Sequence, residues 1–284
     1  MSKKVASPER IMVPLPSHSI VPIEDMHKAP VLQTHQLGID FGGLTAVNNL
    51  NLAIGPTEIC GLIGPNGAGK TTVFNLLTNV YQPTRGTILL DGYDTKGKSC
   101  DQVSKMGIAR TFQNIRLFGK MTVMDNVKIG MHNQLHTSLL SSVTHGFGYR
   151  QAEKQAYDKA KELLDFFGMA DLRHNQAGSL PYGAQRRLEI VRALATNPKI
   201  LLLDEPAAGM NPSETAELME NIRRIRDEFQ IAVMLIEHDM NLVMGICEGI
   251  CVLNYGEIIA KGTPDEIKAN PKVIEAYLGK KADK

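Results

Sequence analysis

The chain has 284 residues, enough for one large domain or two small ones, and its 43% hydrophobic and 21% charged residues are typical of a globular protein. A net charge of +1 gives no electrostatic argument for nucleic acid or an acidic membrane as a partner. The four cysteines show no Cys-x-x-Cys spacing, which favours reduced thiols over a metal site. No apolar run reaches the roughly 18 residues of a membrane-spanning helix, so the sequence predicts a cytosolic chain.

Residues 1–30 contain several prolines and lack a sustained hydrophobic period, so we expect a disordered N-terminal tail there. From Val31 onward the pattern tightens. Residues 45–54 alternate between apolar and polar, residues 58–64 form a short apolar run, and residues 87–92 have the pattern of a strand and a turn. This part of the chain predicts a strand-rich layer that leads into a parallel core.

The second half of the chain alternates between helical and strand patterns. Residues 151–169 place five apolar side chains on one helix face, namely Ala156, Ala160, Leu163, Leu164 and Phe167. Continuous apolar runs at 199–206 and 231–239 predict parallel strands that are buried on both faces. A helix from about Ser213, a hairpin with Gly256 in its turn and a capped terminal helical region complete an α/β fold with a mostly parallel sheet.

A glycine-rich stretch between a predicted strand and a predicted helix matches the pattern Gly-x-x-x-x-Gly-Lys-[Ser/Thr] of a phosphate-binding loop. Its glycines let consecutive backbone N–H groups face a β-phosphate, and the following helix adds the positive end of its dipole. Lys70 would contact the β- and γ-phosphates, and the Thr71 hydroxyl would ligate Mg²⁺. The predicted loop comprises Gly64, Pro65, Asn66, Gly67, Ala68, Gly69, Lys70, Thr71 and Thr72.

Acidic and polar residues follow the two buried strands. Asp204 ends the first strand, where a carboxylate needs compensation, and we expect Mg²⁺ to supply it. Glu205 would then point toward the γ-phosphate, where it could orient and deprotonate the attacking water. His238 ends the next strand and could contact the γ-phosphate, although a lone histidine is usually structural. Gln113 lies in a predicted loop and carries little information by itself.

Together these motifs resemble the nucleotide-binding domain of ATP-binding-cassette (ABC) ATPases. The spacings agree with the family, because Pro181 and Asp204 are 23 residues apart and Glu205 and His238 are 33 apart. The resemblance implies a P-loop NTPase fold with a mostly parallel sheet core, an antiparallel β layer and a helical subdomain.

The resemblance covers about residues 31–279 and implies a single nucleotide-binding domain at 31–284, with its helical subdomain at about 114–185. It implies that Gln113 is the Q-loop glutamine, which responds both to the Mg²⁺ and water site and to the membrane partner. Phe41 takes the place of the aromatic residue that stacks on adenine. The implied catalytic residues are Glu205, His238, Gln113 and Lys70. The implied Mg²⁺ ligands are Thr71, Gln113 and Asp204.

The segment Leu180, Pro181, Tyr182, Gly183 and Ala184 resembles the family signature Leu-Ser-Gly-Gly-Gln with three substitutions. In the family, the signature of one subunit closes over the ATP that the other subunit holds. Pro181 supplies neither the serine hydroxyl nor its own N–H, and one lost hydrogen bond to a charged group costs on the order of 1.5–3 kcal/mol. We therefore expect a true signature with a weakened grip. Residues 208–211 resemble the D-loop, with Asn211 where aspartate is commoner.

A closer resemblance links residues 182–212, 236–247 and 262–279 to the ATP-binding subunits of branched-chain amino acid importers, as does a longer segment at 131–150. It implies ATP and Mg²⁺ as cofactors, and no nucleic acid partner. The implied partners are membrane permease subunits, a second ATPase subunit in a hetero- or homodimer and, indirectly, a periplasmic substrate-binding protein. The implied location is peripheral, on the cytoplasmic face of the inner membrane. The 131–150 segment also holds three histidines without a carboxylate or cysteine to complete a metal site: His132, His136 and His145.

Three functions stay open at this point. The first is the ATPase subunit of an importer, which transmits closure to a permease through roughly residues 113–127; close relatives that serve urea or other amides leave its substrate undetermined. The second is a soluble cassette ATPase of DNA repair or translation, although those proteins usually fuse two cassettes or carry long insertions. The third is a regulatory subunit without turnover, which Glu205 and His238 disfavour and Pro181 keeps open.

Overall fold

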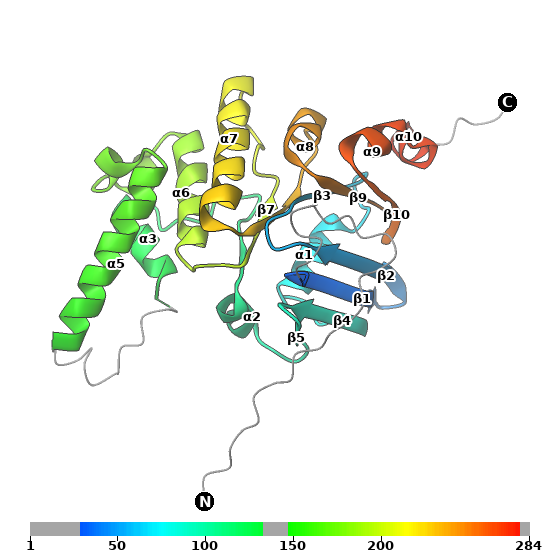
Figure 1. Cartoon of the computed structure of the whole chain (residues 1–284), viewed down its shortest axis with the longest axis horizontal. Coiled ribbons are helices and arrows are strands. Elements are labelled where there is room, and N and C mark those ends of the chain that lie inside the picture. The colour runs from blue at the N-terminus through cyan, green and yellow to red at the C-terminus, as the bar shows by residue number, and fades with distance from the viewer. Residues whose placement is uncertain (1–28, 133–146, 279–284) are drawn as a thin grey trace, which may run out of the picture.

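The structure is a computed structural model that describes residues 29–132 and 147–278. The predicted tail at 1–30 falls almost wholly outside these ranges, and so do His136 and His145. Figure 1 shows a four-stranded sheet on one side, helices α3, α5 and α6 on the other, and a second sheet between them.

The first sheet is antiparallel and has the strand order β2-β1-β4-β5. Its strands are β1 (Leu32–Phe41), β2 (Leu44–Ile54), β4 (Arg85–Leu90) and β5 (Tyr93–Asp94). Strands β1 and β2 form a hairpin whose two turn residues, Gly42 and Gly43, have φ angles of 52° and 92°. A two-residue hairpin turn needs such positive φ angles, which glycine adopts without strain. The strand-rich front layer that the sequence predicts is confirmed.

The second sheet has six strands in the order β10-β9-β3-β8-β7-β6. They are β3 (Ile59–Ile63), β6 (Ile108–Arg110), β7 (Ile200–Asp204), β8 (Ala232–Ile236), β9 (Gly249–Asn254) and β10 (Glu257–Gly262). Strands β6 to β9 pair in parallel with β3 among them, and β10 pairs antiparallel with β9. Every residue of β3, β7 and β8 is buried, which explains their continuous apolar sequences. The carboxyl ends of these three neighbouring strands meet at one edge of the sheet.

Helices cover both faces of this sheet. Strand β7 shows why, because Leu201 and Leu203 belong to a core with the helical region, whereas Ile200 and Leu202 belong to a core with the antiparallel sheet and α1. The helices outside the helical region are α1 (Lys70–Leu77), α2 (Cys100–Met106), α7 (Pro212–Phe229), α8 (Met240–Ile246), α9 (Pro264–Ala269) and α10 (Pro271–Leu278).

Capping residues and prolines set several helix boundaries. Helix α7 begins at Pro212, one residue before the predicted start, because Asn211 forms a capping box with Glu214. The predicted terminal helical region is confirmed, and it divides into α9 and α10 at Asn270. Pro271 accounts for the division, since the residue before a proline is disfavoured in helical conformation.

Among the described residues, the helical region contains α3 (Val123–Gly130), α5 (Phe147–Phe166) and α6 (Tyr182–Leu194). The predicted apolar face of α5 is confirmed, because Ala156, Ala160, Leu163 and Leu164 are all buried. Phe167 is buried as well but follows the end of the helix. Helix α3 packs between α5 and α6 (Figure 1). The apolar face of α5 is therefore buried against α3, within the helical region.

Candidate functional site

The loop between β3 and α1 is held in an open conformation by three glycines. Gly64, Gly67 and Gly69 have φ angles of 152°, 79° and 103°. A Cβ atom on Gly64 would lie 2.0 Å from the carbonyl oxygen of Leu253, and one on Gly69 would lie 2.8 Å from that of Ala46. The loop therefore needs glycine both for its dihedral angles and for its close packing against β9 and β2.

Lys70, the first residue of α1, points back over this loop. Its Nζ donates to the carbonyl oxygens of Gly64 at 2.7 Å and Pro65 at 3.0 Å. Burial lowers the pKa of the Lys70 ammonium, and the negative charges of Glu205 and Asp204 act in the opposite direction. The loop thus combines a partly desolvated cation with a helix N-terminus, which is an arrangement that favours a bound phosphate.

Three of the predicted catalytic residues meet at the carboxylate of Glu205. Gln113 Nε2 donates to Glu205 Oε2 at 2.6 Å, and His238 Nε2 lies 2.9 Å from Glu205 Oε1. Glu205 has a φ angle of 47°, in the left-handed region that non-glycine residues rarely adopt. Its backbone N–H donates to Ile236 of β8 at 2.9 Å, so the sheet edge itself holds this conformation. Strain of this kind is concentrated at functional sites.

Asp204 has a partner that the sequence analysis missed. Its Oδ2 lies 2.7 Å from Arg110 NH2, and both side chains are about 7% exposed. Arg110 also donates to Asn75 Oδ1 at 2.7 Å, and its guanidinium lies over the rings of Phe74 and Phe112. In this structure an arginine of β6 compensates the charge of this buried carboxylate, and the expectation that Asp204 also serves Mg²⁺ stays a prediction.

A second buried arginine joins Gln113 to helix α6. Arg186 is 2% exposed and donates to the carbonyl oxygens of Phe112, at 2.6 Å, and Gln113. It also pairs with Glu189 at 3.1 Å, one turn further along the helix. Nothing in the sequence indicated this role, and the structure shows that Arg186 fixes the backbone at Gln113.

Glu237 is another residue that sequence reasoning missed. It is buried, and its carboxylate accepts from the backbone N–H groups of Ala207 at 2.7 Å and His238 at 2.9 Å. The sequence feature that could have identified Glu237 is a carboxylate directly before His238 at the end of an apolar strand. Glu237 connects the loop after Glu205 to the segment that carries His238.

The signature segment begins helix α6 and does not lie on the chain's own phosphate loop. Pro181 is the N-cap residue and provides no side-chain cap. Leu180 and Ala184 are buried, and Gly183 is partly buried. The contacts of Tyr182 and Gly183 go to the loop after Glu205 and to α7. The segment is thus available to a ligand that another molecule carries.

The remaining predicted ligand-binding residues lie as follows. Phe41 ends β1, is 43% exposed and packs edge-on against Tyr81, with ring centroids 5.2 Å apart. Thr71 and Thr72 lie in the first turn of α1 and are exposed and partly exposed. Asn66 and Gly67 are exposed at the tip of the phosphate loop, and the next residue, Ala68, is buried. An exposed ring at the end of β1 can stack on a flat ligand.

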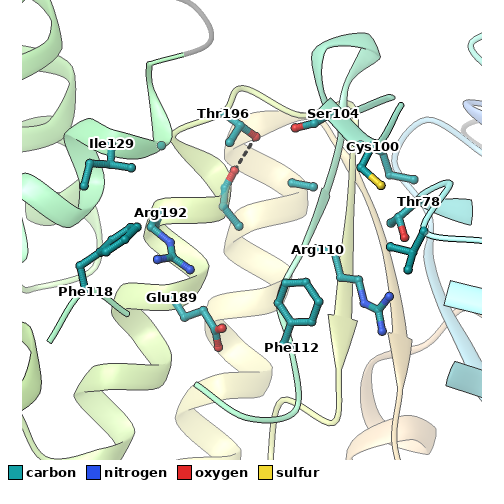
Figure 2. Close-up of a pocket in the computed structure, with 15 residues that line it drawn as sticks. Thr78, Cys100, Ser104, Arg110, Phe112, Phe118, Ile129, Glu189, Arg192 and Thr196 are labelled. Atoms are coloured by element: carbon teal, nitrogen blue, oxygen red, sulfur yellow. Dashed lines mark hydrogen bonds between the residues drawn. The ribbon is translucent and has the colours of Figure 1, made fainter. Parts of the chain in front are cut away.

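A pocket of about 430 Å³ lies beside this site, and Arg110 and Phe112 are among the residues that line it. Figure 2 shows Arg110 and Phe112 on one side of it and Phe118, Ile129 and Arg192 on the other. Its walls are built from α2 and β6 on one side and α3 and α6 on the other. Arg110 therefore contacts Asp204 in the site and also lines this pocket.

The comparisons with known proteins agree with the geometry. Residues 47–208 match the family described as ABC transporter, and residues 257–283 match a second family described as branched-chain amino acid ATP-binding cassette transporter. The chain is 51% identical over 250 residues to the high-affinity branched-chain amino acid transport ATP-binding protein LivG of Escherichia coli K12. That match covers 88% of this chain and 98% of LivG.

A second relative and a solved structure point the same way. The chain is 47% identical to the corresponding protein BraF of Pseudomonas aeruginosa, with 88% of this chain and 98% of BraF covered. The ADP conformation of MJ1267, an ATP-binding cassette of an ABC transporter, superposes with a TM-score of 0.77 at 29% identity. That superposition covers 89% of this chain and all of MJ1267.

These matches decide between the alternatives left open by the sequence. LivG and BraF are named as transport proteins, and this chain covers 98% of each of them. The matches therefore favour a transporter subunit over a soluble ATPase with two fused cassettes. Within residues 29–132 and 147–278, no helix has the length and apolar character to cross a membrane. The chain therefore belongs to the ABC transporter family of ATP-binding proteins, whose members hydrolyse ATP to drive transport.

Proposed function

We propose that this chain is the ATP-hydrolysing subunit of an importer for branched-chain amino acids. The observation that carries the hydrolysis is the convergence of Gln113 and His238 on the carboxylate of Glu205, at the sheet edge next to the phosphate loop. The match of residues 257–283 and the identity to LivG and BraF support the substrate class.

ATP would bind along the loop and its flanking elements. Backbone N–H groups of the non-proline residues of the phosphate loop, together with the Lys70 ammonium, would hold the phosphates. In this structure the ammonium donates to two carbonyl oxygens of its own loop. Phe41, exposed at the end of β1, would stack on the adenine ring. Binding would therefore replace contacts of Lys70 with neutral carbonyl oxygens by contacts with negatively charged phosphate oxygens.

Glu205 would act on the attacking water. Its carboxylate lies at the end of β7, and its two oxygens contact Gln113 and His238. A carboxylate held on both sides is preorganised to orient a water molecule and to accept its proton. His238 and Gln113 would keep Glu205 in place and would themselves contact the γ-phosphate and the water.

The donor atoms around the phosphate loop fit Mg²⁺. Thr71 offers a hydroxyl, Asp204 a carboxylate and Gln113 an amide oxygen, and Mg²⁺ prefers oxygen ligands together with phosphate and water. Asp204 keeps one oxygen beyond its pair with Arg110. When bound there, Mg²⁺ would neutralise charge on the β- and γ-phosphates. With Arg110 paired to it, Asp204 would reach the ion through water.

A second ATPase subunit would complete the site. The segment 180–184 contacts its own α7 and the loop after Glu205, so it is free to close over nucleotide on the second subunit. The bare N-terminus of α6 would supply the positive dipole end for that γ-phosphate. This arrangement makes ATP the ligand that joins two subunits.

The permease would dock at the pocket between α2 and β6 on one side and α3 and α6 on the other (Figure 2). Phe118 and Ile129 expose apolar surface there, and Arg110 joins the pocket to Asp204. An apolar cytoplasmic segment of the permease in this pocket would contact the 113–127 region directly. The chain would then lie peripherally on the cytoplasmic face of the membrane, and a periplasmic binding protein would deliver the substrate to the permease.

The test is uptake by the reconstituted transporter. The chain is purified with its permease and partner ATPase subunits, placed in vesicles, and supplied with binding protein, ATP and Mg²⁺. We expect labelled leucine, isoleucine and valine to accumulate inside, with phosphate release stimulated by the loaded binding protein. Uptake of urea or other amides in place of these amino acids would overturn the substrate class. Phosphate release that is indifferent to permease and binding protein would overturn the importer function.

A further inference from the structure

Tyr182 makes a contact that its place in the signature does not explain. The family signature has glycine at this position, whereas here the Tyr182 hydroxyl donates to the carbonyl oxygen of Ala208 at 3.0 Å. A Cβ atom built on Gly209 would lie 3.5 Å from the Tyr182 ring, so the ring also packs on the loop backbone. The first residue of α6 is therefore attached to the loop that follows Glu205.

That loop is a short, internally bonded unit. The Ala208 N–H donates to the carbonyl oxygen of Glu205 at 3.2 Å, and the Met210 N–H donates to that of Ala207 at 3.0 Å. The Ala207 N–H is held by the buried Glu237 carboxylate at 2.7 Å. One residue, Ala208, thus bonds Glu205 through its N–H and Tyr182 through its carbonyl.

Helix α7 closes the unit from the other side. Asn211 caps α7 and exchanges hydrogen bonds with Glu214, whose Oε1 would lie 3.1 Å from a Cβ atom on Gly183. The first turns of α6 and α7 consequently meet at the 206–211 loop. Displacing α6 relative to Glu205 would break or stretch the Tyr182–Ala208 bond.

We propose that Tyr182 is a positioning residue that couples the signature helix to the catalytic carboxylate of the same chain. The proposal rests on the proposed function, in which 180–184 closes over ATP on a second subunit. Closure there places α6, Tyr182 transmits that placement to Ala208, and Ala208 sets the backbone of Glu205. ATP in the partner's site thereby promotes hydrolysis in this one.

The Tyr182→Phe variant removes the hydroxyl and keeps the ring. The purified transporter complex is prepared with any other ATPase subunit inactivated at its own catalytic glutamate, so that the phosphate measured comes from this chain. We expect kcat for ATP to fall about three- to tenfold, the value of one neutral hydrogen bond. KM for ATP stays within about twofold, because Tyr182 does not touch the nucleotide held by this chain, and the melting temperature stays unchanged.

Tyr157→Phe is the matched control, because it removes a hydroxyl from a tyrosine of similar exposure on α5. It leaves kcat and KM at wild-type values.

Three results would overturn the proposal: unchanged kcat, a rise of KM at constant kcat, or a fall of kcat matched by a lower melting temperature. A complex that turns over ATP without importing amino acids would overturn the importer function and leave this comparison intact, since the comparison reads ATP turnover alone.

Discussion

Two regions of this chain differ in how many of their polar groups find partners within the chain. One is the sheet edge that carries the proposed catalytic residues Lys70, Asp204 and Glu205, called the catalytic edge below. The other is the signature segment, residues 180–184. At the edge, the chain provides partners for the polar groups: Lys70 has two carbonyls, Asp204 has Arg110, and Glu205 has Gln113 and His238. In the signature, α6 starts at Pro181 without a side-chain cap. The polar groups of the catalytic edge are paired within the chain, whereas the N-terminus of α6 is left to bind a ligand that a second chain holds.

The difference shows where substitution is tolerated. A change at the catalytic edge leaves a buried charge without its partner, which is costly whatever binds nearby. A change at the start of α6 removes one hydrogen bond from an exposed helix end, while the dipole and the remaining N–H groups persist. This explains how the signature can depart from the family pattern at Pro181 while the phosphate loop follows it.

The largest expected effect comes from the catalytic edge. Glu205→Gln keeps the shape of the side chain and its contacts with Gln113 and His238 but removes the base. We expect ATP turnover to fall about 10²- to 10⁴-fold with nucleotide affinity maintained, since general base catalysis is worth that much. Phosphate release and nucleotide titration measure the two effects separately.

Glu220→Gln is the control for this prediction, because Glu220 forms an exposed pair with Arg223 one turn further along α7 and lies outside the proposed site. Its turnover should equal that of the wild type. If Glu205→Gln retained more than about a tenth of the turnover, Glu205 would not be the base.

The buried pair at the edge gives the next effect. Arg110→Ala leaves Asp204 buried without a counter-charge, so we expect the free energy of unfolding to fall by about 3–5 kcal/mol. Chemical denaturation measures this loss. Lys105→Ala, which breaks the exposed pair with Asp101 in α2, should cost no more than about 0.5 kcal/mol. Equal losses in the two variants would show that Asp204 is solvated in solution.

The sequence predicts the catalytic edge well because its signals are local. The glycine pattern of residues 64–72 and the apolar runs before Asp204 and His238 each lie within one short segment, so no knowledge of the fold was needed. The parallel order of the strands then makes their ends meet, and in the structure His238 Nε2 lies 2.9 Å from Glu205 Oε1. Residue type and chain order were sufficient here.

The sequence predicts the connections between regions poorly, because these are set by contacts between distant segments. Arg110 lies 94 residues from Asp204, and Arg186 lies 73 from Gln113, so neither pair is visible as a spacing motif. Strand β6 is short and its sequence has the appearance of a loop, which concealed its place beside β7. The contact of Tyr182 with Ala208 depends in the same way on how α6 packs.

Arg186 tests the connection between the two regions. Arg186→Lys keeps the charge but loses the planar group that donates to both Phe112 and Gln113. We expect the free energy of unfolding to fall by about 1.5–3 kcal/mol, the value of hydrogen bonds to a charged group. We also expect turnover to fall, because the backbone of Gln113 loses its anchor. Denaturation and phosphate release would reveal these losses, and wild-type values in both would show that Gln113 is held by other contacts.

The smallest expected effect is at the signature itself. Pro181→Ser restores the hydroxyl and the N–H at the N-cap of α6, so ATP-driven closure should tighten about tenfold, at the low end of the value of a hydrogen bond to a charged group. The measurement is the mass of the complex by light scattering, with Glu205→Gln blocking hydrolysis and ATP titrated. Pro271→Ser, at the start of α10, controls for a general effect of replacing proline at a helix start.

The same experiment separates two forms of the ATPase pair. If the Glu205→Gln chain alone forms a stable dimer with ATP, then residues 180–184 bind nucleotide despite Pro181. The signature segment would then differ less from the catalytic edge in its competence to bind ATP. If it remains a monomer until a different ATPase subunit is added, the pair has one strong and one weak ATP site. Closure that does not change in Pro181→Ser would mean that the dipole of α6 and its backbone N–H groups alone determine the grip, so that the serine hydroxyl of the usual signature contributes nothing here.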